Sequence, residues 1–426
     1  MKTLRLAAIA LALMLPLHAG AGDAYDTFFT EGRLRIDLIF AGNARQQEVF
    51  LDCITAEPAW SGSRTNLVPA FDYGEYTTEV RTPGGELIFS RGFSSLFQEW
   101  RSTAEAGQVN RAYTNSAWIP MPRGEVRFSV LARNADGSRS ELLSFTIDPQ
   151  DKAIARGAEN SYKVCKWLDN GPIENKVDLC IVAEGYTAAE MEKFYSDVER
   201  LSGYLFGCEP FKSRKGDFNI WVVESVSEES GTDMPHMGIW RNTVASSNFY
   251  TFGIDRYLTA PDHKKVASIA SAVPHDALYV VVNHPVYGGG GIYNYYALSS
   301  SDHPDATYVF PHEFGHSFAG LGDEYYEKGV AYENMYPAGV EPWEPNITTL
   351  TDFASKWEDM ISPGTPVPTP NDPSWQGKVG LFEGGGYVAK GVWRPWYDCR
   401  MKSNKAPGFC PVCQRAINMM IDYYCK

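Results

Sequence analysis

Two histidines and a glutamate in the second half of the chain have the spacing of a metal-dependent hydrolytic site. His312, Glu313 and His316 form H-E-x-x-H within the stretch "YVFPHEFGHSFAGLGDEYY". Residues at positions i and i+4 lie on one face of a helix, so the two imidazoles can reach one ion. A catalytic Zn2+ typically keeps three protein ligands and one water. The pattern therefore predicts Zn2+ bound by His312 and His316, with Glu313 as the general base that acts on the water.

The third metal ligand has to follow this helix. Gly320 and Gly322 are expected to end it, because glycine commonly takes the left-handed conformation that stops a helix. The chain can then return beneath the metal. Asp323 is the first carboxylate after the turn, so we predict Asp323 as the third ligand and Glu324 as the alternative, or as a group that supports the loop or a ligand. The other interpretation is a pair of solvated acids just past a helix end.

The N-terminus has the pattern of an export signal. Lys2 and Arg5 precede an apolar run, Leu6–Leu17, and small residues follow it, which predicts a signal peptide at 1–21 that is cleaved after about Ala21. The apolar run is too short to span a bilayer, and no later stretch is long and apolar enough. We expect a secreted, periplasmic or cell-surface protein without an integral membrane segment.

The composition limits the class of protein. The chain has 426 residues, enough for two or three domains, and 44% of them are apolar, so a folded core is expected. The formal net charge is −14 at pH 7. Proteins that bind phosphate backbones need a basic surface, so nucleic acid is excluded as a partner. The sequence leaves the oligomeric state open.

The eight cysteines favour disulfide bonds, because their number is even and the chain is predicted to be exported. Half of them lie close to the C-terminal end, namely Cys399, Cys410, Cys413 and Cys425. A redox motif at "CPVC", or a zinc site closed by these four thiolates, is the alternative.

Residues 23–150 are predicted to form an antiparallel β-sandwich that serves as an accessory domain. Apolar and polar residues alternate in several segments separated by Gly, Asn and Pro turns. These segments are "RLRIDLIFAG", "QEVFLDCITAE", "GELIFSRGF" and "GEVRFSVLARNADGSRSELLSFTID". The alternation stops at Asp148–Asn160, where we place the domain boundary.

Residues 160–426 are predicted to form a mixed α/β catalytic domain. Val177–Ala183 has the apolar run of a buried strand. Thr187 and Glu190 form a capping box that begins a helix over Ala188–Leu205. "FNIWVVESVS" and "DALYVVVN" are two further strands of the same kind. The whole chain is therefore expected to be an α+β and α/β multidomain protein.

Two segments beside the motif carry further expectations. The glycines of Gly288–Gly291 allow either a close backbone approach or an ordinary connector. The following "GIYNYYALS" is strand-like, and such a strand can pair along its edge with an extended peptide. Asn334–Lys378 is long, irregular and Pro-rich, which is typical of a functional loop. It contains a glycosylation sequon that begins at Asn346.

Several separated motifs resemble the IgA-peptidase family of zinc metallopeptidases, a metzincin-like group. In order along the chain they are "HEFGHSFAGLGDEY", "EGGGYVAKGVWRP", "DCRMKS" and "FCPVC". The resemblance covers about Lys176 to Cys425. The region before it is similar to the N-terminal domain that is often joined to these enzymes, so the resemblance implies a β-sandwich followed by a metzincin-like zinc peptidase domain.

The resemblance also implies roles for single residues. By it, His312 and His316 bind zinc, Glu313 is the catalytic base, and Asp323 stands where relatives have an aspartate ligand. Metzincins more widely have a third histidine six residues after the second, but Gly322 occupies that position here. The aspartate assignment therefore depends on the narrower family.

The resemblance makes Met401 the methionine turn, an apolar floor beneath the zinc. A buried methionine with a packing role alone is the alternative. A bond from Cys399 to Cys410 or Cys413 would hold this loop under the metal.

The predicted function is a secreted zinc-dependent endopeptidase that hydrolyses extracellular protein or glycoprotein substrates, such as mucosal or immunoglobulin-like proteins. Glu313 assists the attack of zinc-bound water, and Tyr387 and Tyr397 are candidate donors to the oxyanion. The alternative is a surface protein- or glycan-binding protein with a vestigial zinc site. The intact Glu313 favours the enzyme, because a structural site needs no base. A zinc hydrolase that acts on another amide is a third possibility.

Overall fold

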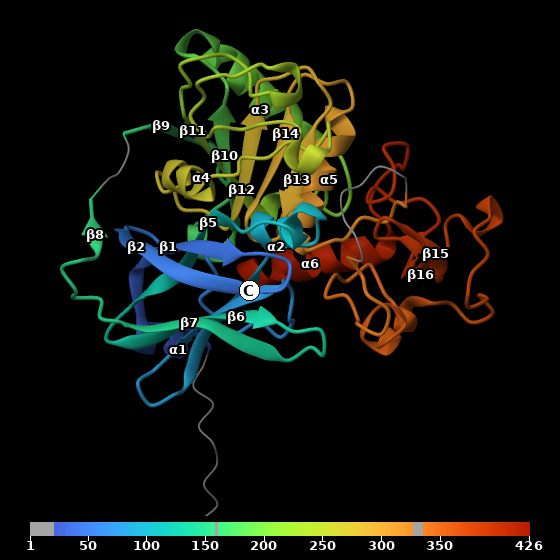
Figure 1. Ribbon diagram of the computed structural model, residues 1–426, viewed down its shortest axis with the longest axis horizontal. Helices are drawn as coiled ribbons and strands as arrows, with labels where there is room; N and C mark the ends of the chain where they lie inside the picture. Colours follow the sequence, from blue (N-terminus) through green and yellow to red (C-terminus); the bar gives the residue numbers. More distant parts are fainter. Residues whose placement is uncertain (1–20, 158–160, 327–334) are drawn as a thin grey trace, which may run out of the picture.

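The computed structural model describes residues 21–157, 161–326 and 335–426. Residues 1–20 of the predicted signal peptide lie outside this range. The chain is a mixed α/β protein in which several β-sheets and helices follow an N-terminal domain (Figure 1). In the ranges described, none of the helices has the length and apolar character that a bilayer crossing requires.

The N-terminal domain contains two four-stranded sheets. Its strands are β1 (Phe29–Gly42), β2 (Gln47–Glu57), β3 (Tyr76–Arg81), β4 (Leu87–Phe93), β5 (Arg111–Pro122), β6 (Val126–Arg133), β7 (Arg139–Ile147) and β8 (Ala155–Arg156). One sheet has the order β5-β1-β2-β8 and the other β4-β3-β6-β7. Helices α1 (Ala21–Phe28) and α2 (Leu96–Arg101) flank them. Strand β8 pairs with β2 and lies within Asp148–Asn160, the segment where the domain boundary was placed.

Strand β1 is buried on both faces, which explains why its polar residues alternate with apolar ones. Leu34 and Ile36 face the core that the two N-terminal sheets share. Arg33, Arg35 and Asp37 point to the other side and are also fully buried, against the rest of the molecule. The alternation predicts an exposed polar face, but here that face is an internal interface.

The second half of the chain is built on one six-stranded sheet. Its strands are β9 (Lys163–Leu168), β10 (Val177–Glu184), β11 (Phe218–Glu224), β12 (Ala277–Val282), β13 (Gly289–Ile292) and β14 (Tyr296–Ser300). The order is β13-β14-β12-β10-β11-β9. The four central strands are parallel, and the edge strands β9 and β13 run antiparallel to their neighbours.

The two faces of this sheet belong to two different cores. Successive residues of β10 point to opposite faces, and Leu179 and Ile181 pack with helices α3 (Met191–Leu205), α5 (Ala306–Ala319) and α6 (Pro411–Cys425). Cys180 and Val182 pack with α4 (His263–Ala270) and with the core of the N-terminal domain. The sheet is therefore enclosed, which accounts for its apolar strands.

Helix α3 begins with the predicted capping box. The side chains of Thr187 and Glu190 each receive the backbone N–H that the motif requires. The first turn, Ala188–Glu190, is a 3-10 helix, and the α-helix follows at Met191. The predicted helix is therefore confirmed, with a tighter first turn.

The chain after α5 is mostly irregular. The hairpin β15 (Phe382–Gly385) and β16 (Val388–Arg394) is its only sheet within the described residues. Single 3-10 turns occur here and elsewhere, at Glu105–Gly107, Ile173–Asn175, Lys215–Asp217, Pro235–Met237, Thr251–Gly253, Phe353–Ser355, Glu358–Met360 and Pro373–Trp375. Trp357 is fully buried and anchors the predicted Pro-rich loop.

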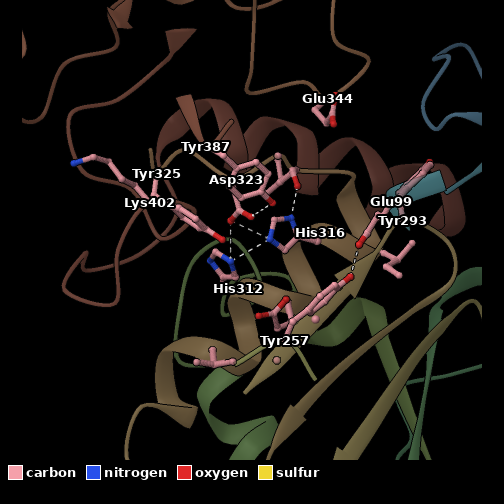
Figure 2. A pocket seen from close by; sticks show the side chains of 18 of the residues that line it. Glu99, Tyr257, Tyr293, His312, His316, Asp323, Tyr325, Glu344, Tyr387 and Lys402 are labelled. Atoms are coloured by element: carbon pink, nitrogen blue, oxygen red, sulfur yellow. Dashed lines mark hydrogen bonds and ion pairs between the residues drawn. The ribbon is translucent and has the colours of Figure 1, made fainter. Parts of the chain in front are cut away.

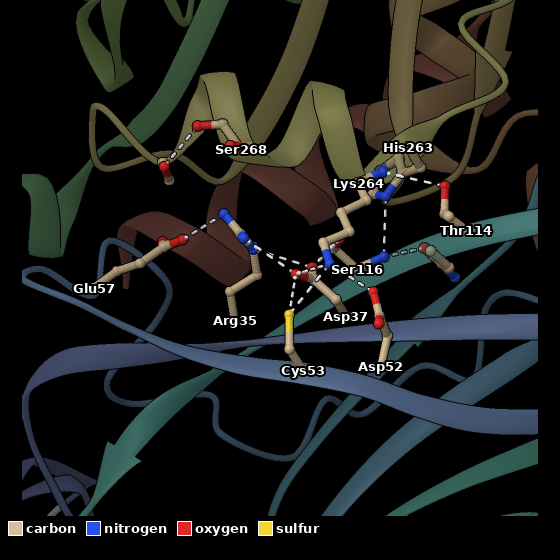
Figure 3. A network of polar contacts seen from close by, with 12 residues as sticks. Arg35, Asp37, Asp52, Cys53, Glu57, Thr114, Ser116, His263, Lys264 and Ser268 are labelled. Carbon is tan, nitrogen blue, oxygen red and sulfur yellow. Dashed lines mark hydrogen bonds and ion pairs between the residues drawn. The ribbon is translucent and has the colours of Figure 1, made fainter. Parts of the chain in front are cut away.

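The N-terminal domain is joined to the rest by polar as well as apolar contacts. In one cluster, Asp37 accepts hydrogen bonds from Arg35 and Ser116, and Lys264 of α4 reaches the edge of β2 at Asp52 (Figure 3). Nearby, Arg33 donates to the carbonyl of Val273 at 3.2 Å. Arg35 and Asp37 are thus paired within the N-terminal domain, whereas Arg33 and Lys264 form the contacts that cross the interface and help to fix the orientation of the two parts.

Candidate metal centre and active site

Helix α5 presents the H-E-x-x-H motif on one side. His312 and His316 are one turn apart, and their Nε2 atoms lie 3.1 Å from each other. The helix ends where the sequence predicts, at Gly320, whose φ of +63° is left-handed. The chain then turns back toward the two imidazoles.

Asp323 completes a cluster of three metal-ligating atoms (Figure 2). Its Oδ1 lies 3.2 Å from His312 Nε2 and 3.3 Å from His316 Nε2. Two N or O ligands of one tetrahedral Zn2+ lie about 3.3 Å apart, given the usual bond lengths. Oδ1 is buried and makes no hydrogen bond, although both imidazoles are adjacent. The three residues therefore fit one metal ion.

The remaining ring nitrogen of each histidine is held by a backbone carbonyl. His312 Nδ1 lies 2.9 Å from the carbonyl oxygen of Arg400, and His316 Nδ1 contacts the carbonyl oxygen of Leu321. A proton on Nδ1 satisfies the carbonyl and leaves the Nε2 lone pair for a metal. These contacts select the tautomer that ligation needs.

The electrostatics of the cluster favour a cation. Burial lowers the pKa of His316, but the carboxylate of Asp323 outweighs this effect and raises the pKa to about 9. The same imidazoles hold the pKa of Asp323 far below its usual range, against the effect of burial. A positive charge between these groups is thus stabilised, and bound metal would have to displace a proton.

Glu313 lies beside the two histidines and is packed against strand β13. A Cβ added to Gly289 would lie 2.5 Å from Glu313 Oε1, and one added to Gly291 would lie 2.8 Å from His316 Cβ. The glycines therefore allow a close backbone approach. Of the two interpretations of Gly288–Gly291, this one fits the structure, and an ordinary connector does not. Burial raises the pKa of Glu313 and the two histidines oppose this rise, which suits a general base.

Of the two candidate tyrosines, the structure brings only Tyr387 to the site. Its hydroxyl donates to Asp323 Oδ2 at 2.6 Å, and it lines the cavity. Its φ of +69° is left-handed, which is strained for a tyrosine. Tyr397 packs against Phe382 and is not among the lining residues.

Met401 lies under helix α5, as expected for an apolar floor. It is fully buried, and its sulfur would lie 3.2 Å from a Cβ added to Gly315, between the two histidines. Its carbonyl accepts from the N–H of Glu324 at 2.8 Å. The floor is thereby tied to the segment that carries Asp323.

Asn346 is a supporting residue that the sequence analysis did not identify. Its side chain accepts from the N–H of Gly322 at 2.7 Å and donates to the Gly322 carbonyl at 2.9 Å. It also donates to Glu324 at 3.0 Å. Asn346 is fully buried, so the sequon cannot carry a glycan in the folded protein. The spacing in sequence gave no signal for this contact.

The metal-ligating atoms open into a cavity of about 450 Å³. Glu75 and Glu99 of the N-terminal domain line it, together with Gly290 of β13 and Tyr336 and Glu344 from the long loop. Burial raises the pKa of Glu344 to about 7, and the nearby carboxyl of Glu75 adds to this rise. The N-terminal domain is therefore part of the site, although no catalytic residue types cluster in its sequence.

The class of protein follows from this arrangement. Metal-dependent hydrolases use sites of this kind, in which a helix carries H-E-x-x-H and a returning segment brings a further carboxylate to the two histidines.

Two family models match the chain and identify it further. IgA Peptidase M64 matches residues 165–376 and 371–421, and Peptidase M64 N-terminus matches residues 24–144. The chain belongs to the IgA Peptidase M64 family, which confirms the resemblance seen in the motifs. No curated protein matches it. The protein is a peptidase, and hence a hydrolase, and its family indicates a metal cofactor.

Proposed function

We propose that the protein is a secreted zinc-dependent endopeptidase that cleaves extracellular proteins or glycoproteins. The observation that carries this proposal is the cluster of His312, His316 and Asp323, whose three donor atoms lie within 3.3 Å of one another. A carboxylate oxygen of Glu313 lies within 4.8 Å of ring nitrogens of His312 and His316, close enough to act on a water held there. We further propose a metzincin-like catalytic domain and a sandwich arrangement of the N-terminal sheets.

The chemistry divides between the metal and Glu313. When bound, Zn2+ would polarise the scissile carbonyl and lower the pKa of a water in the site. Glu313 takes a proton from the attacking water and gives one to the leaving amine.

Strand β13 supports the proposed binding of an extended peptide. It is the outer strand of the sheet and lines the cavity. The Gly289 carbonyl already accepts from Leu258, and the Tyr293 carbonyl accepts from Ser94. The edge that can pair with a peptide is therefore short and centres on Gly290–Gly291, opposite Glu313.

The first experiment is the substitution Glu313→Gln. We expect unchanged zinc content and a loss of hydrolysis of roughly 100-fold or more, because only the proton transfer is removed. Glu192→Gln, at an exposed position on α3, is the matched control and should retain activity. Activity would be followed by mass spectrometry on a panel of mucosal glycoproteins. Full activity in Glu313→Gln would contradict the proposed role of Glu313 as the general base.

A second experiment locates the metal. Anomalous scattering at the zinc edge should give a peak bonded to His312, His316 and Asp323, with one position left for water. Zinc closed by four protein ligands at this place would contradict a catalytic role.

A further inference from the structure

A second cluster of metal-ligating side chains lies beneath the metal centre. It consists of Glu324, Cys399, Cys410 and Cys413, whose ligand atoms all lie within 4.8 Å of one another. All four residues are buried. They come from three separate segments: the chain after α5, the loop at Met401 and the start of α6. The proposed peptidase chemistry uses none of them.

The distances within this cluster match a tetrahedral zinc site. Cys399 Sγ lies 3.7 Å from Cys413 Sγ, and Cys413 Sγ lies 3.4 Å from Glu324 Oε1. With Zn–S bonds of about 2.3 Å and Zn–O bonds of about 2.0 Å, tetrahedral geometry separates two sulfurs by about 3.8 Å and a sulfur from an oxygen by about 3.5 Å. All eight cysteines are free thiols, so the disulfides predicted from the sequence are not formed here.

One oxygen of Glu324 lacks a partner in the described part of the protein. Its Oε2 is buried without a hydrogen-bond partner, and an isolated buried carboxylate is costly. Arg394 is also buried, and its hydrogen bonds go to backbone carbonyls and to the amide of Asn371. A disulfide would pair two of the thiols but would leave this carboxylate and the third thiol as they are.

The start of α6 and a backbone N–H would help to hold thiolates at a bound cation. Cys410 is the N-cap of α6 and Cys413 lies in its first turn, where the positive end of the helix dipole stabilises negative charge. Cys399 Sγ accepts a hydrogen bond from the backbone N–H of Cys410 at 3.2 Å. Cys425 is excluded, because it is at the other end of α6, next to the carbonyl of Asp217.

We propose that Glu324, Cys399, Cys410 and Cys413 bind a structural Zn2+. Three soft thiolates and one carboxylate form a closed donor set that leaves no position for a reacting water. This proposal corrects the four-thiolate alternative of the sequence analysis, in which Cys425 was the fourth ligand. It also gives Glu324 a role that is distinct from that of the neighbouring Asp323.

The second ion would position ligands of the first. Glu324 follows Asp323 directly, and Cys399 precedes Arg400, whose carbonyl holds His312 Nδ1. The structural ion would therefore join the segment that carries Asp323 to the segment whose Arg400 carbonyl orients His312. We therefore expect its loss to weaken metal binding at the catalytic site by roughly 10- to 100-fold, as for other supporting groups.

The test uses the full chain, purified without chelator or reductant, and zinc as the probe. Elemental analysis should find about two Zn2+ per chain, and about one in the double variant His312→Ala/His316→Ala. Replacement of the zinc in that double variant by Co2+ should give thiolate-to-cobalt charge-transfer absorption. Adding Cys413→Ser or Glu324→Gln should reduce or shift this absorption, whereas adding Cys208→Ser, a free cysteine elsewhere, should not.

The double variant keeps the test decisive if a cysteine variant fails to fold. X-ray absorption at the zinc edge should then show three sulfur ligands and one oxygen ligand in the double variant. A disulfide among the three cysteines, or three free thiols without a bound ion, would overturn the proposal. The double variant lacks the histidines of the catalytic site, so its zinc content and X-ray absorption report on the cysteine cluster alone. The outcome therefore does not depend on whether the peptidase proposal is right.

Discussion

At the scale of single residues, the carboxylate of the proposed third metal ligand, Asp323, is oriented from both sides. Asp323 directs Oδ1 at the histidines while Oδ2 accepts the hydroxyl of Tyr387. The strained backbone of Tyr387 is stabilised because its N–H donates to the carbonyl of Tyr325 at 2.9 Å. We therefore propose the tyrosine as a positioning residue of the candidate metal centre.

Tyr387→Phe should lower the affinity of this centre for zinc by roughly 10- to 100-fold, because Asp323 loses the bond that fixes its orientation. A competition titration against a chromophoric chelator measures the change. Tyr397→Phe is the matched control, because Tyr397 lies outside the cavity. Equal affinities in the two variants would mean that the hydroxyl does not position Asp323.

Some residues of the site could be predicted from the sequence and others could not, and the difference has a physical reason. His312, Glu313 and His316 share one helix, so their spacing determines their geometry. Asp323 follows one glycine turn later and was within reach of the same argument. Asn346 and the carbonyl of Arg400 reach the site through tertiary contacts. No local sequence pattern predicts such contacts.

At the scale of elements, the site depends on how closely α5 approaches β13. A Cβ added to Gly291 would lie 2.3 Å from the carbonyl oxygen of Glu313, a backbone atom that cannot move independently of the helix. The glycines are thus a packing requirement of the helix that carries the motif.

Gly291→Ala should lower the free energy of unfolding by about 1–3 kcal/mol, as overpacked sites do, and should reduce activity by displacing His316. Gly203→Ala is the matched control on α3, where an added Cβ meets nothing within 4 Å. That substitution should stabilise the protein by about 0.4–1 kcal/mol. Denaturant unfolding and hydrolysis assays would measure both, and a neutral Gly291→Ala would refute the packing argument.

The elements themselves were largely predictable. Buried strands such as β10 carry continuous apolar runs, and the capping box marks the start of α3. The strand-like "GIYNYYALS" contains the turn between β13 and β14. The turn was missed because aromatic residues are enriched in strands and the segment is rich in them. β3 and β5 were not predicted, since their alternation is broken by buried polar residues.

At the scale of the whole molecule, the domains share one apolar core. Buried residues of β1 and β6 belong to the same cluster as Val182 of the six-stranded sheet. Arg91 strengthens the junction by donating to the Asp276 carbonyl at 3.0 Å and to the Tyr424 hydroxyl at 2.7 Å. The sequence analysis divided the chain by composition and had no means to detect this continuity, because it arises from tertiary contacts.

The protein should therefore unfold in one transition, with coincident curves from tryptophan fluorescence and far-ultraviolet circular dichroism. Arg91→Ala should lower the midpoint, because it removes buried hydrogen bonds worth about 1–3 kcal/mol. Arg127→Ala, at an exposed ion pair with Glu141, should cost less than about 1 kcal/mol. Two separate transitions in the parent protein would show that the domains fold independently.

The stability of the molecule should also depend on a buried pair of carboxyls, Asp178 and Asp276. The N–H of Asp178 donates to Asp276 at 2.9 Å, and each side chain keeps one oxygen without a partner. Burial raises the pKa of both, and the charge of Asp178 raises that of Asp276 further. The folded state therefore holds a proton that the unfolded state releases above the usual carboxyl pKa of about 4.

Because the folded state binds more protons, the free energy of unfolding should fall as the pH rises from the usual carboxyl range toward the raised pKa of Asp276. Asp276→Asn removes this titration and keeps an oxygen for the Asp178 N–H. The variant should gain stability relative to the parent between about pH 5 and about pH 8, by about 1.4 kcal/mol for each unit of pKa shift removed. Denaturant titrations at both pH values test this, with the exposed Glu86→Gln as control. Parallel pH dependences in Asp276→Asn and the parent would contradict the assignment.

The adjacency of Asp323 and Glu324 constrains how this chain can change in length. Asp323 lies against the two histidines, whereas the next residue, Glu324, reaches Cys413. A single residue inserted or deleted between His316 and Asp323 would displace both carboxylates and disturb both clusters at once. Insertions in engineered or natural variants are therefore expected in the long loop after residue 335, and the interval from His316 to Glu324 is expected to keep its length.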